Sequence, residues 1–249
     1  MCHETDSRPP AFGESGRITE QGALVLTAGD GTRFSALHAF TAATGDPAGV
    51  IILPDARGTH PYYDALARRF AANGFNAVVV DYYGRTAGPG ARDADFPWRE
   101  HFPHLDPADV TQDVRAAHDF LRAHGDGPVV VVGFCYGGGQ SWMLAAGDLE
   151  LAGCVGFYGL PAFAAGVVDE IHVPLLLLLA GEDVATGPAE FDAFTARLDA
   201  AGKDYEKHVY AGAPHSFFDA AYDEWQDACR DAWSRTLDFI QRRTSAVGA

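Results

Sequence analysis

Short apolar runs that alternate with amphipathic helical segments constrain the fold of this chain most. The runs are continuous rather than alternating and are rich in valine, isoleucine and leucine; they cover residues 50–53, 76–80, 129–133, 154–158, 175–180 and 205–210. Such runs are typical of strands in a parallel sheet that helices cover on both faces. The pattern therefore predicts an α/β domain with a mostly parallel, doubly wound sheet and right-handed crossovers.

The segments between and around these runs complete the predicted topology. Residues 23–27 and 34–40 are strand-like and flank Asp30-Gly31, a pair that favours an antiparallel N-terminal hairpin. Asp106 followed by Pro107 indicates the start of a helix that ends before Gly125. Further helices are expected over 62–73, 138–147, 189–201 and 225–240. Residues 1–22 read as a polar N-terminal arm, and 23–249 as a single domain.

Composition excludes several classes of protein. The chain has 249 residues, of which 47% are hydrophobic, so a disordered chain is excluded. Its net charge of −16 argues against partners such as nucleic acid or an anionic membrane, since both need a basic face. The polar N-terminus has no signal-peptide pattern, and no apolar run approaches the ~20 residues of a membrane span. We therefore expect a soluble, cytoplasmic protein.

The cysteines give no sign of a disulfide scaffold or a structural metal. Cys2, Cys135, Cys154 and Cys229 form no CxxC pair and no cysteine–histidine set at zinc spacing. Histidines at positions 101 and 104 lie in an aromatic-rich segment, where a solvated or packing role is more common than a metal site. We therefore expect reduced cysteines and no bound metal.

The most informative segment follows the apolar run at 129–133. It reads Gly133-Phe-Cys135-Tyr-Gly137, a GxCxG pattern at a predicted strand-to-helix junction. In a nucleophile elbow the sharp turn strains the nucleophile, and glycine two residues before and after avoids clashes. The thiol would stand at a helix N-terminus, which favours thiolate, and the Tyr136 N–H would face the same space and stabilise an oxyanion. The alternative is a buried structural cysteine in a glycine-rich turn.

Two other motifs that this segment suggests are excluded by single residues. A dinucleotide-binding fingerprint needs GxGxxG, but its second glycine position is occupied by Cys135. A cysteine-phosphatase loop needs an arginine six residues after the cysteine, where this chain has Ser141.

An acid and a base follow later strands in the order that a hydrolase of this type requires. Asp183 comes directly after the run at 175–180, with Glu182 as a competitor, and His215 follows the last predicted strand. The chain order nucleophile, acid, base is that of α/β-hydrolases. His215 would accept the proton during acyl transfer, and Asp183 would fix its tautomer. A turn-forming aspartate and a structural histidine are the alternatives.

At these residues the sequence resembles the dienelactone hydrolase family of α/β-hydrolases, from about residue 23 to 243. The segments that carry the resemblance are Gly133-Phe-Cys-Tyr-Gly-Gly138, Gly181-Glu-Asp183, Gly212-Ala-Pro-His215-Ser-Phe217, residues 50–58 (VIILPDARG) and Asp81-Tyr-Tyr-Gly-Arg85. The resemblance implies an α/β-hydrolase fold and the hydrolysis of ester or lactone bonds by a Cys–His–Asp triad. It also implies that no cofactor takes part.

The resemblance implies roles for three residues outside the triad. Asp55 stands where the family has a glutamate that contacts the resting nucleophile and helps to generate thiolate. Ala56 would supply the second oxyanion N–H, and Arg85 matches a family arginine that binds the substrate carboxylate. Each of these two charged residues also has a structural alternative: Asp55 could be a turn residue, and Arg85 could be a surface residue. A second family arginine is replaced here by Asp219, which favours a different ester or a larger lactone.

Aromatic side chains near the same strand ends predict an apolar acyl site. Tyr83, Phe217 and Phe218 are the candidates for substrate contact, and the loop 84–103 is expected to form a wall; core packing is the alternative for each. The predicted function is a cysteine-dependent hydrolase of a small-molecule ester or lactone, as a monomer or homodimer. The alternative is a non-hydrolytic ligand-binding or redox-sensing relative that uses Cys135 as an activated thiol.

Overall fold

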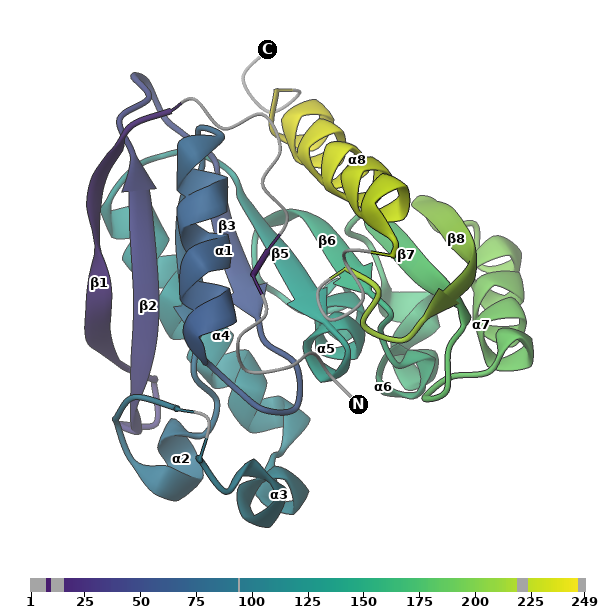
Figure 1. The fold of residues 1–249 in the computed structure, drawn as a ribbon, viewed down its shortest axis with the longest axis horizontal. Coiled ribbons are helices and arrows are strands. Elements are labelled where there is room, and N and C mark those ends of the chain that lie inside the picture. The colour runs from purple at the N-terminus through teal and green to yellow at the C-terminus, as the bar shows by residue number, and fades with distance from the viewer. Residues whose placement is uncertain (1–7, 10–15, 94, 219–223, 246–249) are drawn as a thin grey trace.

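A computed structural model describes residues 8–9, 16–93, 95–218 and 224–245 of the chain. Its centre is an eight-stranded sheet with the order β1-β2-β4-β3-β5-β6-β7-β8 (Figure 1). The strands are β1 (Ile18–Thr27), β2 (Arg33–Thr41), β3 (Gly49–Leu53), β4 (Asn76–Val80), β5 (Val129–Phe134), β6 (Leu151–Phe157), β7 (Leu175–Glu182) and β8 (Tyr205–Pro214).

The sheet has the predicted mixed topology. β1 pairs with β2 in antiparallel fashion, and β2 also pairs antiparallel with β4. Every other pair, from β3/β4 through β7/β8, is parallel. The register places Leu53 of β3 opposite Gly133 of β5, and Phe134 opposite Phe157 of β6. The carboxyl ends of β3, β5 and β6 therefore meet at one edge, where binding sites gather in parallel sheets.

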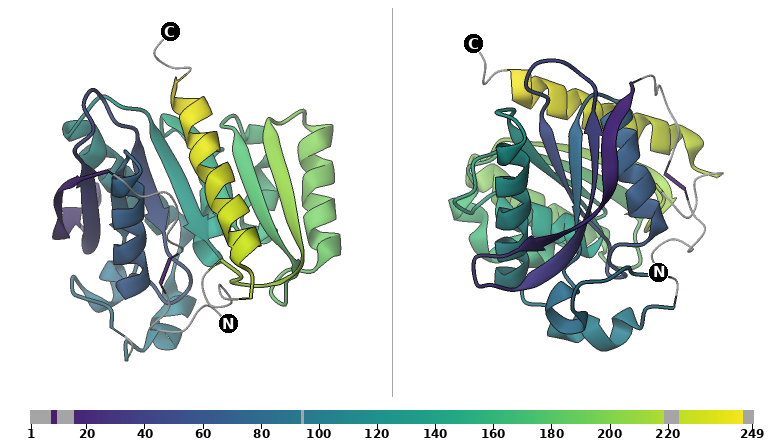
Figure 2. Two further views of the ribbon diagram at one scale, coloured as in Figure 1. Left: turned by 45° about the horizontal axis from the view of Figure 1, so that its top comes forward. Right: turned by 90° about the vertical axis from the view of Figure 1, so that its left-hand side faces the viewer.

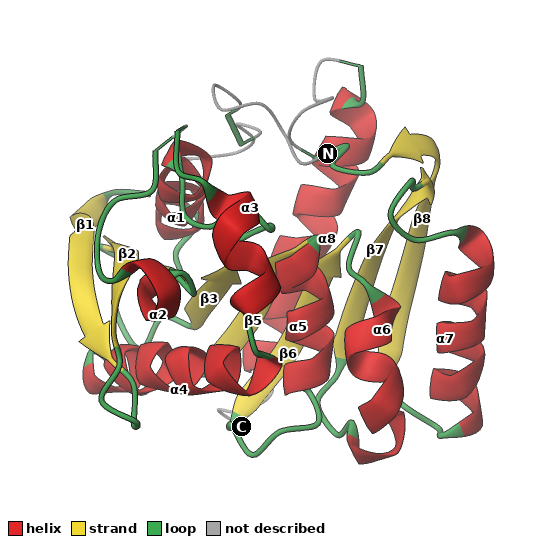
Figure 3. Ribbon diagram, turned by 90° about the horizontal axis from the view of Figure 1, so that it is seen from below, coloured by secondary structure: helices red, strands yellow, loops and turns green. Residues whose placement is uncertain are grey.

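Helices cover both faces of the sheet, which explains why the central strands are apolar throughout. The helices are α1 (Pro61–Ala72), α2 (Gly84–Ala87), α3 (Trp98–His101), α4 (Pro107–Ala123), α5 (Tyr136–Leu144), α6 (Pro161–Ala164), α7 (Pro188–Ala200) and α8 (Gln226–Ser245), with 3-10 turns at Phe102–His104 and Ala165–Glu170. α1 and α8 cover one face (Figure 2). α4, α5 and α7 cover the other (Figure 3).

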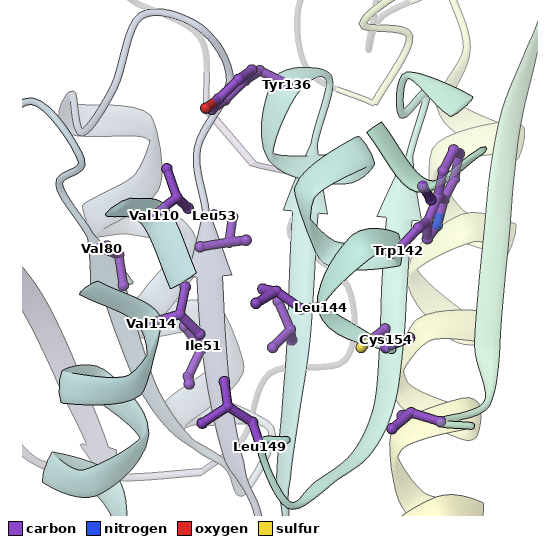
Figure 4. Packing of buried hydrophobic residues seen from close by; sticks show 14 of the residues in the cluster. Ile51, Leu53, Val80, Val110, Val114, Tyr136, Trp142, Leu144, Leu149 and Cys154 are labelled. Atoms are coloured by element: carbon purple, nitrogen blue, oxygen red, sulfur yellow. The ribbon is translucent and has the colours of Figure 1, made fainter. Parts of the chain in front are cut away.

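Successive side chains of each buried strand point alternately into the two hydrophobic core layers, one on each face of the sheet. Ile51 and Leu53 of β3 point toward α4, where they meet Val110 and Val114 (Figure 4). Their neighbours Val50 and Ile52 belong to the opposite layer, beneath α1. Both sets are fully buried, so the sheet is fixed from both sides and its carboxyl edge can present side chains in defined positions.

The elements differ from the sequence prediction where local signals are weak, and two differences lie near the N-terminal hairpin and the predicted loop. β1 begins at Ile18 rather than at residue 23, because residues 18–22 lie on an exposed edge strand and carry little apolar signal. Short helices α2 and α3 occupy part of the predicted loop 84–103, since four residues are too few to show helical periodicity. No helix among the described residues is long and apolar enough to cross a membrane.

Candidate active site

Cys135 occupies a strained turn between β5 and α5. Its φ of 53° and ψ of −112° lie in a region that residues with a side chain rarely adopt. A Cβ on Gly133 would collide with the Gly137 carbonyl, and one on Gly137 would collide with the carbonyls of Leu53 and Pro54. The turn thus has the strand–turn–helix geometry predicted from the GxCxG spacing, and its glycines are there for the predicted reason.

The backbone around Cys135 is held in place by neighbouring strands. The Cys135 N–H donates to the Phe157 carbonyl at 3.0 Å, which extends the β5/β6 pairing, and its carbonyl accepts from the Gly139 N–H at 3.2 Å. Cys135 is buried, with only 8% of its surface exposed. The thiol is therefore in a fixed, largely dry position at the first turn of α5.

Asp183 and His215 are brought together from the ends of β7 and β8. The Nδ1 of His215 lies 2.8 Å and 2.9 Å from the two carboxylate oxygens of Asp183. Asp183 Oδ1 also accepts the N–H groups of Ala185 at 2.7 Å and Thr186 at 3.1 Å. Glu182, the competing acid, is exposed. Asp183 is thus the acid that contacts the histidine.

His215 also hydrogen-bonds Cys135, so the three predicted triad residues form one connected group. Burial is the largest influence on the imidazole and lowers its pKa, but the hydrogen bonds to Asp183 and Cys135, with their negative charges, outweigh it. The pKa of His215 is raised to about 9. This environment favours an imidazolium, the partner that a cysteine thiolate requires.

The two predicted oxyanion amides belong to segments that meet at the Cys135 elbow. Tyr136 begins α5, directly after Cys135, and Ala56 lies on the β3–α1 loop, whose Pro54 carbonyl abuts the elbow at Gly137. Within the described part of the chain, neither the Ala56 nor the Tyr136 N–H has a hydrogen-bond acceptor. Free N–H groups beside a nucleophile are what an oxyanion hole needs.

Asp55 is engaged within its own loop and by α1. Its Oδ1 accepts from the Arg57 N–H at 2.7 Å, and its Oδ2 accepts from the Tyr63 hydroxyl at 3.0 Å. The side chains of Arg57 and His60 lie 3.6 Å and 3.8 Å from the carboxylate. These contacts fit the alternative in which Asp55 is a turn residue. The predicted effect of Asp55 on the Cys135 thiol stays a prediction.

Arg85 is held by three carboxylates from two segments, the turn between β1 and β2 and helix α4. Its Nη1 lies 2.6 Å from Asp30 and 3.4 Å from Asp109, and its Nη2 lies 2.9 Å from Asp113. Asp113 is fully buried on α4, and burial raises its pKa to about 7 although Arg85 opposes that shift. The guanidinium therefore links the hairpin, α2 and α4, and its predicted contact with a substrate carboxylate would have to compete with these partners.

Replacement of Arg85 by methionine is expected to lower the free energy of unfolding by about 3 kcal/mol, because Asp113 would lose its buried partner. Urea denaturation measures the change, and Arg115→Met, whose partner Asp148 is exposed, is the control with little expected effect. Adding Asp113→Leu should recover part of the loss. A selective rise in KM for a carboxylate-bearing lactone over a neutral ester would instead support the predicted substrate contact.

The predicted aromatic substrate contacts lie in the core around the site. Phe217 packs against Tyr158 and Tyr210, and Phe218 packs against Phe134 and Phe157; both phenylalanines are fully buried. Their substrate role stays a prediction. Asp219, the proposed replacement of a family arginine, lies outside the described residues.

An aromatic cluster surrounds the residue that follows the nucleophile. The ring of Tyr136 contacts those of Tyr82, Phe102 and Phe163, with centroids 5.2–5.4 Å apart. Phe102 comes from the segment expected to wall the site. The sequence predicts no separate role for Tyr82. The feature that could have indicated one is the Tyr82-Tyr83 pair, which follows the end of β4 at the same edge of the sheet as the other site residues.

The mixed sheet with helices on both faces is that of an α/β-hydrolase. A solved structure from Klebsiella pneumoniae, described as a "Putative Dienelactone Hydrolase", has the same fold, with a TM-score of 0.75 at 23% identity over 88% of this chain and 99% of that one. The model of the dienelactone hydrolase family matches residues 34–244. The chain therefore belongs to the dienelactone hydrolase family.

Two curated relatives are similar over most of their length. One, from Yersinia pestis, is named "Putative carboxymethylenebutenolidase" and is 28% identical over 82% of each chain. The other, from Bradyrhizobium, is named "Probable 2-oxo-3-(5-oxofuran-2-ylidene)propanoate lactonase" and is 28% identical over 80% of this chain and 85% of its own. The protein is accordingly a hydrolase of the dienelactone hydrolase type.

Proposed function

We propose that this protein hydrolyses lactones or carboxylic esters by nucleophilic attack of Cys135 and through an acyl-enzyme. The observation that carries the proposal is the connected group in which His215 bonds both Cys135 and Asp183 at the carboxyl edge of the sheet. An activated nucleophile needs a base within hydrogen-bond reach and a third group that orients the base. Family membership and the lactonase relative support the same reaction class.

The first half of the reaction forms a thioester. The Cys135 sulfur bonds to the substrate carbonyl carbon, and the carbonyl electrons move to oxygen, where the Ala56 and Tyr136 N–H groups stabilise the negative charge. When the carbonyl re-forms, the C–O bond to the leaving group breaks. The protonated His215 gives its Nε2 proton to the departing alkoxide, and Asp183 holds the Nδ1 side of the ring.

The second half returns the enzyme to its starting state. Neutral His215 accepts a proton from water while the water oxygen attacks the thioester carbon. Collapse of this second intermediate breaks the C–S bond, releases the carboxylic acid and leaves a thiolate beside imidazolium. In a lactone the alkoxide stays tethered to the acyl group, so the product is one hydroxy acid.

The surroundings of the site favour a mostly apolar substrate. Tyr136, Phe102 and Phe163 supply aromatic surface beside the nucleophile, and the cation expected to bind a carboxylate, Arg85, already pairs with three aspartates. We therefore propose a neutral ester or lactone as the better substrate class.

Rapid acid quenching during turnover of 4-nitrophenyl acetate tests the proposal. Mass spectrometry of the digested protein should find an acetyl group on the peptide that carries Cys135, together with a burst of nitrophenol. Cys2, Cys154 and Cys229 are internal controls and should remain unmodified. Turnover with no acetyl group on Cys135, or acetylation of another residue that keeps pace with turnover, would overturn the proposed mechanism.

A further inference from the structure

Two consecutive tyrosines at the end of β4 bind the loop that carries the proposed oxyanion amide. The Tyr82 hydroxyl donates to the Pro54 carbonyl and lies 3.1 Å from the Asp55 carbonyl. The Tyr83 hydroxyl donates to the Ala56 carbonyl. Three consecutive carbonyls of the β3–α1 loop are therefore held by two neighbouring side chains from the next strand of the sheet.

The backbone N–H groups of the same loop also donate hydrogen bonds, with one exception. The Asp55 N–H donates to the Tyr63 hydroxyl at 2.8 Å, the Arg57 N–H to Asp55 Oδ1 at 2.7 Å, and the Gly58 N–H to the Asp55 carbonyl at 3.0 Å. Among contacts between described residues, the Ala56 N–H alone of these four has no acceptor. The loop is fixed so that one amide remains free to donate.

Peptide geometry connects the Tyr82 hydroxyl to that amide. The Asp55 carbonyl and the Ala56 N–H belong to one planar peptide unit, so a hydrogen bond that orients the carbonyl also orients the N–H. The Tyr82 side chain is fully buried, and burial raises its pKa well above the ordinary value, which keeps the hydroxyl protonated. The hydroxyl therefore remains a donor whose single proton is shared between the Pro54 and Asp55 carbonyls, and it holds the peptide units on both sides of Asp55.

Contacts with the Cys135 elbow place the first residues of this loop against α5. A Cβ on Gly137 would collide with the Leu53 and Pro54 carbonyls, so the loop lies against the first turn of α5. The Tyr82 ring contacts the ring of Tyr136, whose N–H is the other oxyanion donor. The aromatic ring thus spans the space between the two segments that supply the oxyanion amides.

We propose that Tyr82 and Tyr83 are positioning residues for catalysis, which hold the β3–α1 loop so that the Ala56 N–H points at the developing oxyanion. The inference rests on the proposed function and deepens it. Tyr82 orients the peptide that contains the donor, and Tyr83 fixes the following peptide through the Ala56 carbonyl. Tyr83 thereby acts through the backbone of the loop, whereas the sequence predicted a substrate contact.

Tyr82→Phe is the main test, because it removes the hydroxyl and keeps the buried ring. Loss of an oxyanion donor costs about 10²–10³ in kcat, and a donor that is misaligned should cost less. We expect kcat to fall about 10- to 100-fold with KM nearly unchanged, and Tyr83→Phe to show a smaller fall of the same kind. Tyr205→Phe, whose hydroxyl donates to the surface residue Asp199, is the matched control.

Binding of an aryl trifluoromethyl ketone separates positioning from a structural role. Its thiol adduct carries an oxyanion, so its inhibition constant should rise by about the same factor as kcat falls. The rate of Cys135 alkylation by iodoacetamide, which forms no oxyanion, should stay within a few-fold. Destabilisation with unchanged kcat and inhibition constant, or a rise in KM alone, would overturn the inference. Failure of wild-type Cys135 to become acylated would instead overturn the proposed function.

Discussion

Cys135→Ala is expected to lower kcat/KM for 4-nitrophenyl acetate and for simple lactones by about 10⁴-fold or more. The reason is that a protein whose nucleophile is removed keeps only the catalysis that its oxyanion amides and binding contacts supply, and loss of a triad nucleophile costs about 10⁶ in kcat in a comparable hydrolase. Cys135 is in the positive-φ turn, where alanine adopts the same backbone as cysteine. The variant should therefore fold normally.

Two further variants sharpen this result. Cys135→Ser keeps a nucleophilic atom of higher pKa, so it should retain more activity than the alanine variant and lose the reaction with iodoacetamide. Cys154→Ala, a change at a buried cysteine in β6, should leave kcat/KM within a few-fold. Initial rates and circular dichroism measure activity and folding. A folded alanine variant that keeps a tenth of wild-type activity would contradict a cysteine nucleophile.

The parts of the site that depend on local geometry could be predicted from the sequence. The spacing of Gly133, Cys135 and Gly137 reflects clashes within one tight turn, so those residues alone define the elbow. Asp183 and His215 could be placed because each directly follows a strand, and parallel strands bring such positions to one edge. The sequence already favours Asp183, which follows β7, over Glu182, which ends it, and the structure adds the contact between Asp183 and His215.

The partners of the remaining polar residues could not be predicted in this way. Arg85 pairs with Asp30 in the hairpin turn and with Asp109 and Asp113, which lie one helical turn apart on α4. In the sequence these three aspartates look like ordinary solvated acids. The hydroxyl contacts of Tyr82 and Tyr83 depend on β4 lying beside β3, although 27 or 28 residues separate the partners in the chain. Such pairings follow from strand order, which local pattern does not encode.

Asp183→Asn is expected to lower kcat for ester hydrolysis by about 10⁴-fold, the loss seen when the acid of a Ser-His-Asp triad is neutralised. The asparagine keeps the shape of the side chain, but its amide group presents N–H to His215 Nδ1 or an uncharged oxygen in place of a carboxylate. The imidazole then loses the partner that fixes its tautomer and its charge. The protein should still fold, because an amide oxygen can accept the Ala185 and Thr186 N–H groups.

The pH profile of this variant gives a second, independent readout. In the wild type His215 titrates at about 9, so the imidazolium that protonates the leaving group is present at neutral pH and is lost as the pH rises through about 9. Hydrolysis of an ethyl ester, whose poor leaving group needs that proton, should decline above that pH, whereas a 4-nitrophenyl ester should decline less. Burial lowers the pKa of His215, and the Asp183 carboxylate opposes that effect. Without the carboxylate the pKa of His215 should fall, so the alkaline decline should move to lower pH.

A surface aspartate provides the control for both measurements. Asp204→Asn removes an exposed carboxylate that pairs with Arg243 at the opposite end of β8 from His215, and it should leave both kcat and the pH profile unchanged. Titration of the His215 ring by NMR checks the pKa directly, and the coupled thiol and imidazole should appear as one pair of macroscopic steps. An Asp183→Asn variant with wild-type kcat and an unmoved alkaline decline would show that Asp183 does not support His215, because both effects come from the same hydrogen-bonded carboxylate.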